Sequence, residues 1–449
     1  MKILFISSLY APDIGGGAEI ILKRTVEGLQ VRGYKVSVLA TSAQPGLHMD
    51  AVDQIKVYRA GLHNLYWHFT AQRPGRLARL GWHLRDRYNH SMREHVKRVL
   101  ELEQPDLVVC HNLTGWSVSA WDEIAAADVP IVQVLHDMYL LCPSSSMFKK
   151  GRSCQQQCGL CARFRKGHDE RSGQVDTVVG VSRYMLDTLQ AYGYFQGSRG
   201  YVVHNASPYS APVRTGKNIP TINLASDTSL RQQAGSCSSP HLESHLRMVG
   251  KSPVEASSLA TPLRFGYMGT LSDPKGVGWL IEQFQHLPCD ATLQIAGRGQ
   301  VADEQRFKAM ATSPNIHFVG YQKPEDFYSQ IDVAIVPSMW NEPFGMVAVE
   351  ACAHSKPVIA SRMGGLTEII QDQFNGLLCS PDDPDSLGVA MLKLHQQPQL
   401  LARLSAQARS SVASFLSLDL MLDQYESIFN QTLLDRIVLP GTHPLSNPV

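Results

Sequence analysis

Short, continuously apolar runs recur along the chain, separated by longer stretches of mixed polarity. In the first part of the sequence these runs cover residues 2–6, 35–40, 106–110, 130–135 and 176–181. Strands that are buried on both faces of a parallel sheet have this pattern, and helical stretches between them indicate crossover connections. We therefore predict a doubly wound α/β domain over residues 1–206, with a glycine turn and a helix at about 18–31 after its first strand.

The same rhythm returns in the second half of the chain. Its apolar runs cover residues 263–268, 292–296, 316–319, 332–336 and 357–360. They predict a second α/β domain over 263–436. Residues 207–262 between the two halves are rich in Ser, Pro and Thr without periodicity, and we interpret them as a linker or disordered insertion. Residues 437–449 read as an unstructured tail. Since open α/β sheets bind ligands beyond the carboxyl ends of their strands, two such sheets facing one another predict an active site in the cleft between them.

Composition narrows the class of protein without naming a reaction. The chain has 449 residues with 41 Lys and Arg against 40 Asp and Glu, so no overall field recruits nucleic acid. It contains no apolar run near the roughly 20 residues that span a bilayer. The start, MKILFISSLYA, continues into PDIGGGAE without a clean cleavage site, and we interpret it as a strand rather than a signal peptide. We therefore expect a cytoplasmic protein, with reduced thiols or a metal site for its nine cysteines.

The stretch EPFGMVAVE, residues 342–350, puts two acids into an otherwise apolar segment. Pro343 suits a first helical position, so the residues after it would offer free backbone N–H groups to a phosphate. Those residues are Phe344, Gly345, Met346 and Val347. Glu342 precedes the helix, and Glu350 lies about 12 Å further along its axis. A ligand that meets both acids carries hydroxyls at two places and an anion between them, as a nucleotide diphosphate sugar does. The spacing alone fits an ordinary capped helix equally well.

This arrangement resembles the E-x7-E motif of the retaining glycosyltransferases of family 4, which have the GT-B fold of two facing Rossmann-like domains. Further similar segments follow in the family's order: PDIGGGAEIILKRTVEGLQVRGYKVSVLAT, VVGVSRYM, YVVHNA, FGYMGTLSDPKGVGWLIEQF, LQIAGRGQ, VGYQ and VIASRMGGLTEII. The resemblance implies a hexosyltransferase-type enzyme that moves a sugar from a nucleotide diphosphate sugar to a hydroxyl of a sugar or lipid-linked acceptor, in polysaccharide or glycolipid assembly.

The resemblance also assigns roles to individual residues. On the donor side it implies that Gly16 and Gly17 approach the diphosphate, that Glu350 holds the ribose and that main-chain groups near Val319 meet the base. In catalysis it implies that Lys275 neutralises the leaving phosphate, that Glu342 holds the donor sugar and that His136 contacts the transferred sugar near the reacting carbon.

One position departs from the family pattern. Thr270 stands where relatives commonly have Arg, and a threonine cannot supply a charged fork to a phosphate. We expect Arg298 or Lys275 to compensate. Retention in the family is explained by attack on the face that the leaving diphosphate vacates. No covalent enzyme intermediate and no catalytic metal are then required, and we interpret the only D-x-D, 383–385, as a turn.

Four cysteines, Cys142, Cys154, Cys158 and Cys161, fall within about twenty residues in a Cys-rich loop, 142–161. Their density predicts a structural tetrahedral Zn²⁺ that pins this loop beside the acceptor cleft. Two alternatives stay open: unligated thiols, and an iron–sulfur cluster of a radical enzyme that uses S-adenosylmethionine.

Residues 58–100 combine basic and aromatic side chains, with eight Lys and Arg against two acids between 73 and 98. This composition fits peripheral contact with anionic lipid at the inner membrane face, or a grip on the diphosphate of a lipid-linked acceptor; a solvated helix face explains it equally well. Two other functions share the predicted fold. A nucleotide-sugar epimerase or hydrolase would turn over donor without an acceptor, and a non-catalytic binding protein would bind it without turnover.

Overall fold

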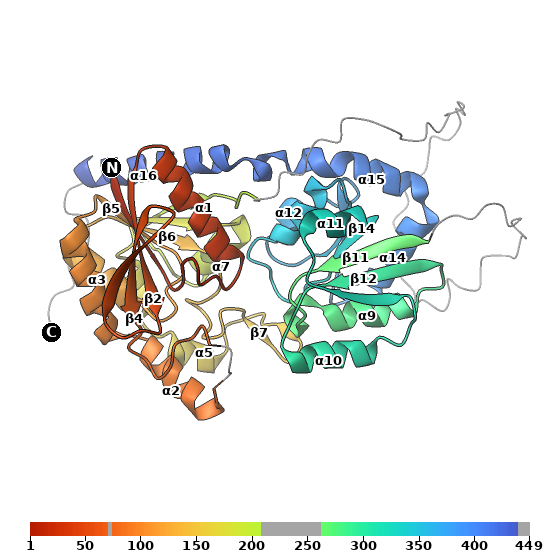
Figure 1. The fold of residues 1–449 in the computed structure, drawn as a ribbon, viewed down its shortest axis with the longest axis horizontal. Coiled ribbons are helices and arrows are strands. Elements are labelled where there is room, and N and C mark those ends of the chain that lie inside the picture. Colours follow the sequence, from red (N-terminus) through yellow and green to blue (C-terminus); the bar gives the residue numbers. More distant parts are fainter. Residues whose placement is uncertain (71–73, 208–261, 439–449) are drawn as a thin grey trace, which may run out of the picture. The chain divides into compact units, whose positions relative to one another are not determined.

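The computed structural model describes residues 1–70, 74–207 and 262–438. The predicted linker, apart from residues 207 and 262, and the tail from residue 439 onward lie outside the described residues. Two open sheets organise the described chain, one in each half of the sequence, drawn in red to yellow and in green in Figure 1.

The first sheet has eight strands in the order β10-β9-β6-β5-β1-β2-β4-β3. The strands are β1 (Lys2–Ser7), β2 (Lys35–Ser42), β3 (Leu47–Val52), β4 (Ile55–Gly61), β5 (Leu107–Cys110), β6 (Ile131–Leu135), β9 (Thr177–Gly180) and β10 (Arg199–Val202). All neighbours pair in parallel except β3, which runs antiparallel to β4 at the edge. The predicted apolar runs form the inner strands, and every residue of β5, β6 and β9 is buried. The predicted doubly wound α/β class is confirmed here.

The edge strand β3 has no counterpart in the apolar pattern. Its sequence LHMDAV leaves the four middle residues exposed. A strand at the edge of a sheet with a solvated face needs no continuous apolar run, so the pattern that locates buried strands passes over it.

The second sheet has six parallel strands in the order β13-β12-β11-β14-β15-β16. They are β11 (Leu263–Met268), β12 (Ala291–Ala296), β13 (Ile316–Gly320), β14 (Val333–Val336), β15 (Val358–Ser361) and β16 (Gly376–Cys379). From β11 the chain builds the sheet outward on one side, through β12 to β13. It then crosses to the other side of β11 and continues through β14 and β15 to β16. Such a reversal creates the crevice in which open α/β sheets bind ligands.

Helices connect the strands of both sheets. In the first half they are α1 (Gly17–Val31), α2 (Arg76–Asp86), α3 (His90–Glu103), α4 (Ser119–Ala126), α5 (Gly159–Phe164), α6 (His168–Ser172) and α7 (Arg183–Ala191). In the second half they are α9 (Val277–Gln285), α10 (Val301–Met310), α11 (Pro324–Ser329), α12 (Met346–Ala353), α13 (Leu366–Ile369), α14 (Ser386–Gln396) and α15 (Pro398–Ser411). The predicted helix at 18–31 is α1. No helix in the described ranges is long and apolar enough to cross a membrane.

The last helix, α16 (Leu418–Val438), returns to the first half of the chain. It packs against α1, as Figure 1 shows for the blue and red helices. Arg32 at the end of α1 bonds to Asp419 and Asp423 of α16. At the other end of the helix, Thr432 Oγ1 lies 2.8 Å from Thr177 Oγ1 at the start of β9. Residues that follow the second sheet in sequence thus help to cover the first.

Candidate functional site

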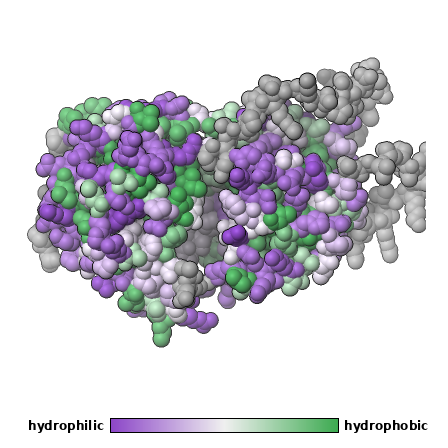
Figure 2. Space-filling model, viewed as in Figure 1, coloured by the Kyte–Doolittle hydropathy of each residue, from purple (hydrophilic) through white to green (hydrophobic). Residues whose placement is uncertain are grey.

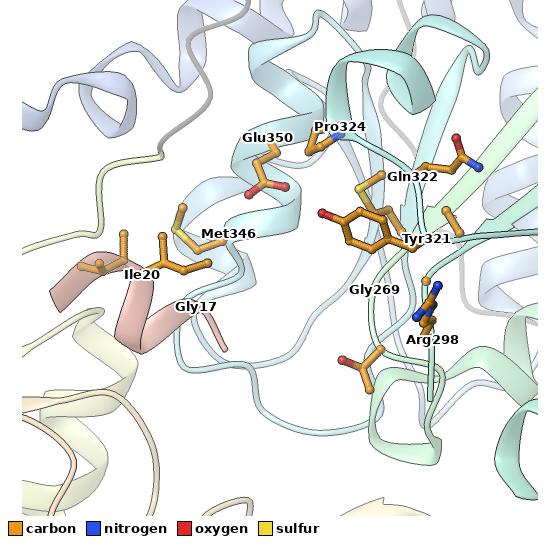
Figure 3. A pocket seen from close by; sticks show the side chains of 14 residues that line it. Gly17, Ile20, Gly269, Arg298, Tyr321, Gln322, Pro324, Met346 and Glu350 are labelled. Carbon is orange, nitrogen blue, oxygen red and sulfur yellow. The ribbon is translucent and has the colours of Figure 1, made fainter. Parts of the chain in front are cut away.

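A cavity of about 330 Å³ opens at the carboxyl ends of the second sheet (Figure 3). Its walls come from the start of α1, from the loops after β11, β12 and β13, and from α12. The lining residues are Gly17, Ile20, Ile21, Met268, Gly269, Thr270, Ala296, Gly297, Arg298, Tyr321, Gln322, Pro324, Met346 and Glu350. Four residues singled out from the sequence, Gly17, Arg298, Met346 and Glu350, therefore share one cavity, and Thr270 joins them.

Glycine geometry brings the loops after β11 and β12 together. Gly297 has a φ of +132°, and a Cβ there would lie 1.8 Å from the carbonyl oxygen of Gly269. Only glycine fits this conformation and this close approach. The approach places Arg298 and Thr270 on the same wall of the cavity. Arg298 is thus positioned where it can supply the positive charge that Thr270 lacks.

The start of α12 differs from the expectation. We predict a helix from Pro343, but the structure begins it at Met346 because Gly345, with φ +111°, breaks the turn before it. Pro343 instead offers its carbonyl oxygen to the Ser182 hydroxyl of the first half. Phe344 is 3% exposed and packs its ring 5.5 Å from that of His204. Phe344 therefore anchors the loop and does not line the cavity.

Glu350 points from α12 toward the cavity (Figure 3). Burial raises the pKa of its carboxyl to about 8, and the charge of Glu325 adds to the effect. The side chain is therefore mostly protonated at neutral pH. A protonated carboxyl both donates and accepts hydrogen bonds, which suits a pair of hydroxyl groups.

Glu342 forms an ion pair with Lys275 beside, but outside, the lining of this cavity. Lys275 Nζ lies 2.7 Å from Glu342 Oε1, and the Ser338 hydroxyl donates to the same oxygen at 2.6 Å. Glu342 is 5% exposed. Burial is the largest single influence and opposes its ionisation, but Lys275 together with hydrogen bonds from Ser338 and Trp340 outweighs burial, so the pKa of Glu342 lies below its usual value. Lys275 Nζ also lies 5.1 Å from the centre of the Trp340 ring, a cation–π distance.

The remaining donor-side residues have partners within the protein. The Gly16 N–H donates to Glu19 Oε2 at 2.8 Å, so this amide is already engaged. Val319, at the end of β13, accepts a hydrogen bond on its carbonyl oxygen from Gln322 Nε2. Val347 similarly accepts one from the Tyr328 hydroxyl at 3.3 Å. None of these three residues lines the 330 Å³ cavity.

His136 follows β6 and lies at a separate, much smaller cavity of about 20 Å³. Its Nε2 is 2.8 Å from Nδ1 of His111, and their ring planes differ by 19°. The 5.0 Å between ring centroids exceeds the N···N distance by about two ring radii, so the rings lie edge to edge in a well-aligned N–H···N bond rather than face to face. Burial lowers the pKa of His136 to about 4.

His111 is absent from the sequence prediction. The signal for it was present, because His111 follows β5 as His136 follows β6, and β5 and β6 are adjacent parallel strands. Side chains that follow neighbouring parallel strands meet at one edge of the sheet.

The four cysteines of the predicted zinc site only partly converge. Cys142 Sγ lies 3.8 Å from Cys161 Sγ, and the hydrogen bond from Cys161 lowers the pKa of Cys142 below its usual value. Among the described residues, no group of three or more His, Cys, Asp or Glu side chains is arranged to hold a metal ion. The structural zinc stays a prediction. The same loop does reach the second half, since Ser153 Oγ accepts from the Asn341 N–H at 3.0 Å.

The basic and aromatic segment 58–100 contains α2, which has two different faces. Leu77, Leu80 and Leu84 are exposed to 84%, 46% and 58%, whereas Trp82 is 3% exposed. Figure 2 shows polar and apolar residues mixed over the face of the molecule in view. The predicted membrane contact stays a prediction.

Each half of the chain matches a family model of glycosyltransferases. Residues 15–207 match the family model described as Glycosyltransferase Family 4, and residues 262–397 match the one described as Glycosyl transferases group 1. A 42.6 kDa protein in the cps region of Klebsiella pneumoniae is 24% identical to this chain. The match covers 82% of this chain and 87% of that protein. Mannosylfructose-phosphate synthase of Agrobacterium fabrum is 30% identical over 34% of this chain, a stretch that spans 39% of that protein.

Solved structures show the same fold. Sucrose-phosphate synthase from Thermosynechococcus elongatus matches with a TM-score of 0.67 at 17% identity, covering 96% of this chain and 99% of that one. Anabaena HepE, in complex with UDP-glucose, matches with a TM-score of 0.64 at 18% identity, covering 96% of this chain and all of that one. The two family models, one for each half, confirm the predicted family, and these structures confirm the predicted fold. The chain belongs to the family 4 glycosyltransferases and has their GT-B fold of two Rossmann-like domains.

Proposed function

We propose that this glycosyltransferase moves a sugar from a nucleotide diphosphate sugar to a hydroxyl of a glycan acceptor, with retention of configuration at the transferred carbon. One observation carries the proposal: Glu350, Arg298 and Gly17, which the sequence places in three separate segments, line a single cavity. That HepE has been solved with UDP-glucose supports a donor of this kind.

The donor is held at two points of this cavity. The ribose hydroxyls bond to Glu350, whose raised pKa leaves it able to donate and accept. The diphosphate lies between the Arg298 guanidinium and the backbone of Gly17 at the start of α1, where a helix dipole favours negative charge.

The reaction breaks the bond between the anomeric carbon and the diphosphate oxygen and forms one to the acceptor oxygen on the same face. The departing phosphate oxygen takes the acceptor's proton, so no protein nucleophile is needed. Lys275 and Arg298 stabilise the charge that develops on the diphosphate. The Lys275 side chain is 31% exposed, and a move of its amine from Glu342 to the phosphate would free the Glu342 carboxylate for the sugar hydroxyls.

The biological setting and location belong to the same proposal. The Klebsiella relative lies in a cps region, and one structural relative is a lipopolysaccharide outer core galactosyltransferase, which supports a role in polysaccharide or glycolipid assembly. Action in the cytoplasm, with the exposed leucines of α2 against the inner membrane face, is consistent with that role.

Calorimetric binding of UDP-, GDP-, ADP- and TDP-sugars tests the donor site. We expect one nucleotide class to bind, and Glu350→Ala and Arg298→Met each to weaken binding at least tenfold, or about 1.4 kcal/mol. Arg403→Met is the matched control, because Arg403 is exposed on α15 and does not line the cavity. This change should alter the affinity less than twofold. A folded protein that binds none of the four sugars would refute the proposal. Donor consumption without any acceptor would instead identify an epimerase or hydrolase.

A further inference from the structure

A second, larger cavity shares no lining residue with the proposed donor cavity. It measures about 750 Å³, within the range of ligand sites. Its walls come from the segment before α2, from α2 itself, from the loops after β5 and β6, and from the loop and helix after β12. The lining residues are Tyr66, His68, Thr70, Pro74, Arg79, Trp82, His83, Thr114, Pro143, Gly299, Gln300, Val301 and Ala302.

Chain continuity places this cavity next to both of the sites already described. Arg298 lines the donor cavity, and Gly299, the next residue, lines the larger one. On the other side, Thr114 donates its N–H to Asn112 Oδ1 at 2.9 Å, and Asn112 lines the small cavity that holds His136. Residues that line the larger cavity are thus adjacent along the chain to residues that line the donor cavity and to residues that line the cavity that holds His136.

Several side chains of the cavity have polar atoms that are buried and lack a partner. Both ring nitrogens of His68, Nδ1 of His83 and Nε of Arg79 have no hydrogen-bond partner within the described chain. Trp82 lies between the two imidazoles, with ring centroids 6.1 Å from His68 and 5.3 Å from His83. Buried polar atoms are ordinarily hydrogen-bonded, so a ligand whose oxygen atoms reached these groups would supply the partners that they lack.

The charge of the cavity is positive. No Asp or Glu occurs among its lining residues, all of which are described, whereas Arg79 contributes a permanent cation. Burial, followed by the charges of Arg165 and Arg79, lowers the pKa of His83 to about 4, so this ring is a neutral hydrogen-bonding group and the positive charge of the lining comes from Arg79. The acid next along α2, Asp86, is fully buried and already accepts from the Gly115 N–H at 2.7 Å and the Tyr139 hydroxyl at 2.9 Å.

We infer that this cavity binds the acceptor, and that the acceptor is a saccharide carrying an anionic group, which Arg79, His68 and His83 receive. The inference rests on the proposed function, because it assigns the second substrate of the same reaction. The anion can be a phosphate, as in a lipid-linked or phosphorylated sugar, or a carboxylate, as in a uronic acid. Both present oxygen acceptors to the same donors.

Binding of small probes to the whole protein tests the inference. Glucose 6-phosphate, glucuronate and glucose are titrated by calorimetry and by the NMR shifts of histidine ring protons, first without nucleotide and then with the donor cavity saturated by its nucleotide diphosphate. We expect at least one anionic sugar to bind tenfold or more tightly than glucose, with the shifts at His68 and His83. Tighter binding of glucose 6-phosphate would identify the anion as a phosphate, and tighter binding of glucuronate would identify it as a carboxylate.

Paired variants of α2 locate the binding. Arg79→Gln should weaken the anionic probe at least tenfold, whereas Arg76→Gln, an exposed arginine one turn earlier on the same helix, should change it less than twofold. The nucleotide affinity of both variants should stay within twofold of the parent, which shows that each has folded.

Equal affinity for charged and neutral sugars, no binding of any probe, or indifference to Arg79→Gln would overturn the inference. If the donor proposal fails, no nucleotide will bind. The titration of the sugar probes without nucleotide tests the acceptor cavity independently of that result.

Discussion

Lys275 and Glu342 are 67 positions apart in the sequence, yet Lys275 Nζ lies 2.7 Å from Glu342 Oε1. The pair links the short helical turn after β11 (Asp273–Lys275) to the loop after β14. These two strands are neighbours in the second sheet, so their carboxyl ends place the two loops side by side. Each residue is a predicted catalytic group, and each is the other's ion-pair partner.

Removing the amine should leave a buried carboxylate without its cation. We expect Lys275→Met to lower the free energy of unfolding at pH 7 by roughly 2 kcal/mol, less than the 3–5 kcal/mol of a fully buried pair because Lys275 is partly exposed. Adding Glu342→Gln should restore most of this stability without restoring sugar transfer. Urea unfolding and transferase assays of the single and double variants measure both effects.

The sign of the pH dependence checks the same pair. Since the pKa of Glu342 is lower in the folded protein than its usual 4.5, the pair's stabilisation is fully present above that value and is lost as the pH falls through the folded pKa. The difference between the parent and Lys275→Met should therefore shrink below pH 4.5. A difference that stayed constant down to acid unfolding would show that the ion pair does not stabilise the fold.

Glu350 should show the opposite pH dependence. Its pKa is about 8 in the folded protein against 4.5 in the free residue, so the folded state holds its proton more tightly and stability falls as the pH rises from about 4.5 to 8. We expect Glu350→Gln to match the parent near pH 4.5 and to unfold at a higher temperature at pH 8.5, by a few degrees. Thermal unfolding across this range measures it.

A neighbouring carboxyl provides the control for Glu350. Glu325→Gln removes the charge that adds to the raised pKa, so it should give a smaller shift in the same direction. An equal loss of stability with pH in the parent and in Glu350→Gln would contradict a raised pKa.

His136 should be a neutral imidazole throughout the physiological range, with its proton on Nδ1. Burial holds its pKa at about 4. If His136 donated from Nε2, His111 would carry its own proton on a buried Nε2 that lacks a partner, so donation from His111 Nδ1 to His136 Nε2 is the less costly arrangement. Long-range ¹⁵N–¹H spectra between pH 5.5 and 8 report the tautomer directly. An Nε2–H tautomer, or a titration in this range, would contradict it.

Gly345 should tolerate no side chain. Its φ of +111° is unfavourable for other residues, and a Cβ would lie 2.5 Å from Cδ2 of Leu366. We expect Gly345→Ala to destabilise the fold by about 1–3 kcal/mol, as measured by urea unfolding. Gly75→Ala is the matched control, because a Cβ at Gly75 meets nothing within 4 Å, and it should cost less than 0.5 kcal/mol, roughly the effect of a surface change. Equal effects of the two changes would contradict the strain argument.

The amino-acid sequence was enough to predict the two α/β sheets and four of the residues that line the donor cavity, Gly17, Arg298, Met346 and Glu350. Strands such as β5, β6 and β14 are buried on both faces, and burial on both faces requires the continuous apolar runs by which they were predicted. Gly17, Arg298 and Glu350 follow from motifs within single segments, because the loop at the end of a strand is encoded next to that strand.

The tertiary structure alone decided what depends on contacts between distant segments. Helix α12 begins at Met346 and not at the predicted Pro343. The Gly16 N–H donates to Glu19, and His111 bonds to His136, neither of which the sequence predicted. The tertiary structure also paired Lys275 with Glu342 and turned one face of α2 into the wall of a positive cavity. Hydrophobic periodicity reports burial along one segment, whereas charge pairing, pKa and cavity lining depend on which loops the sheet order brings together, and no local pattern carries that order.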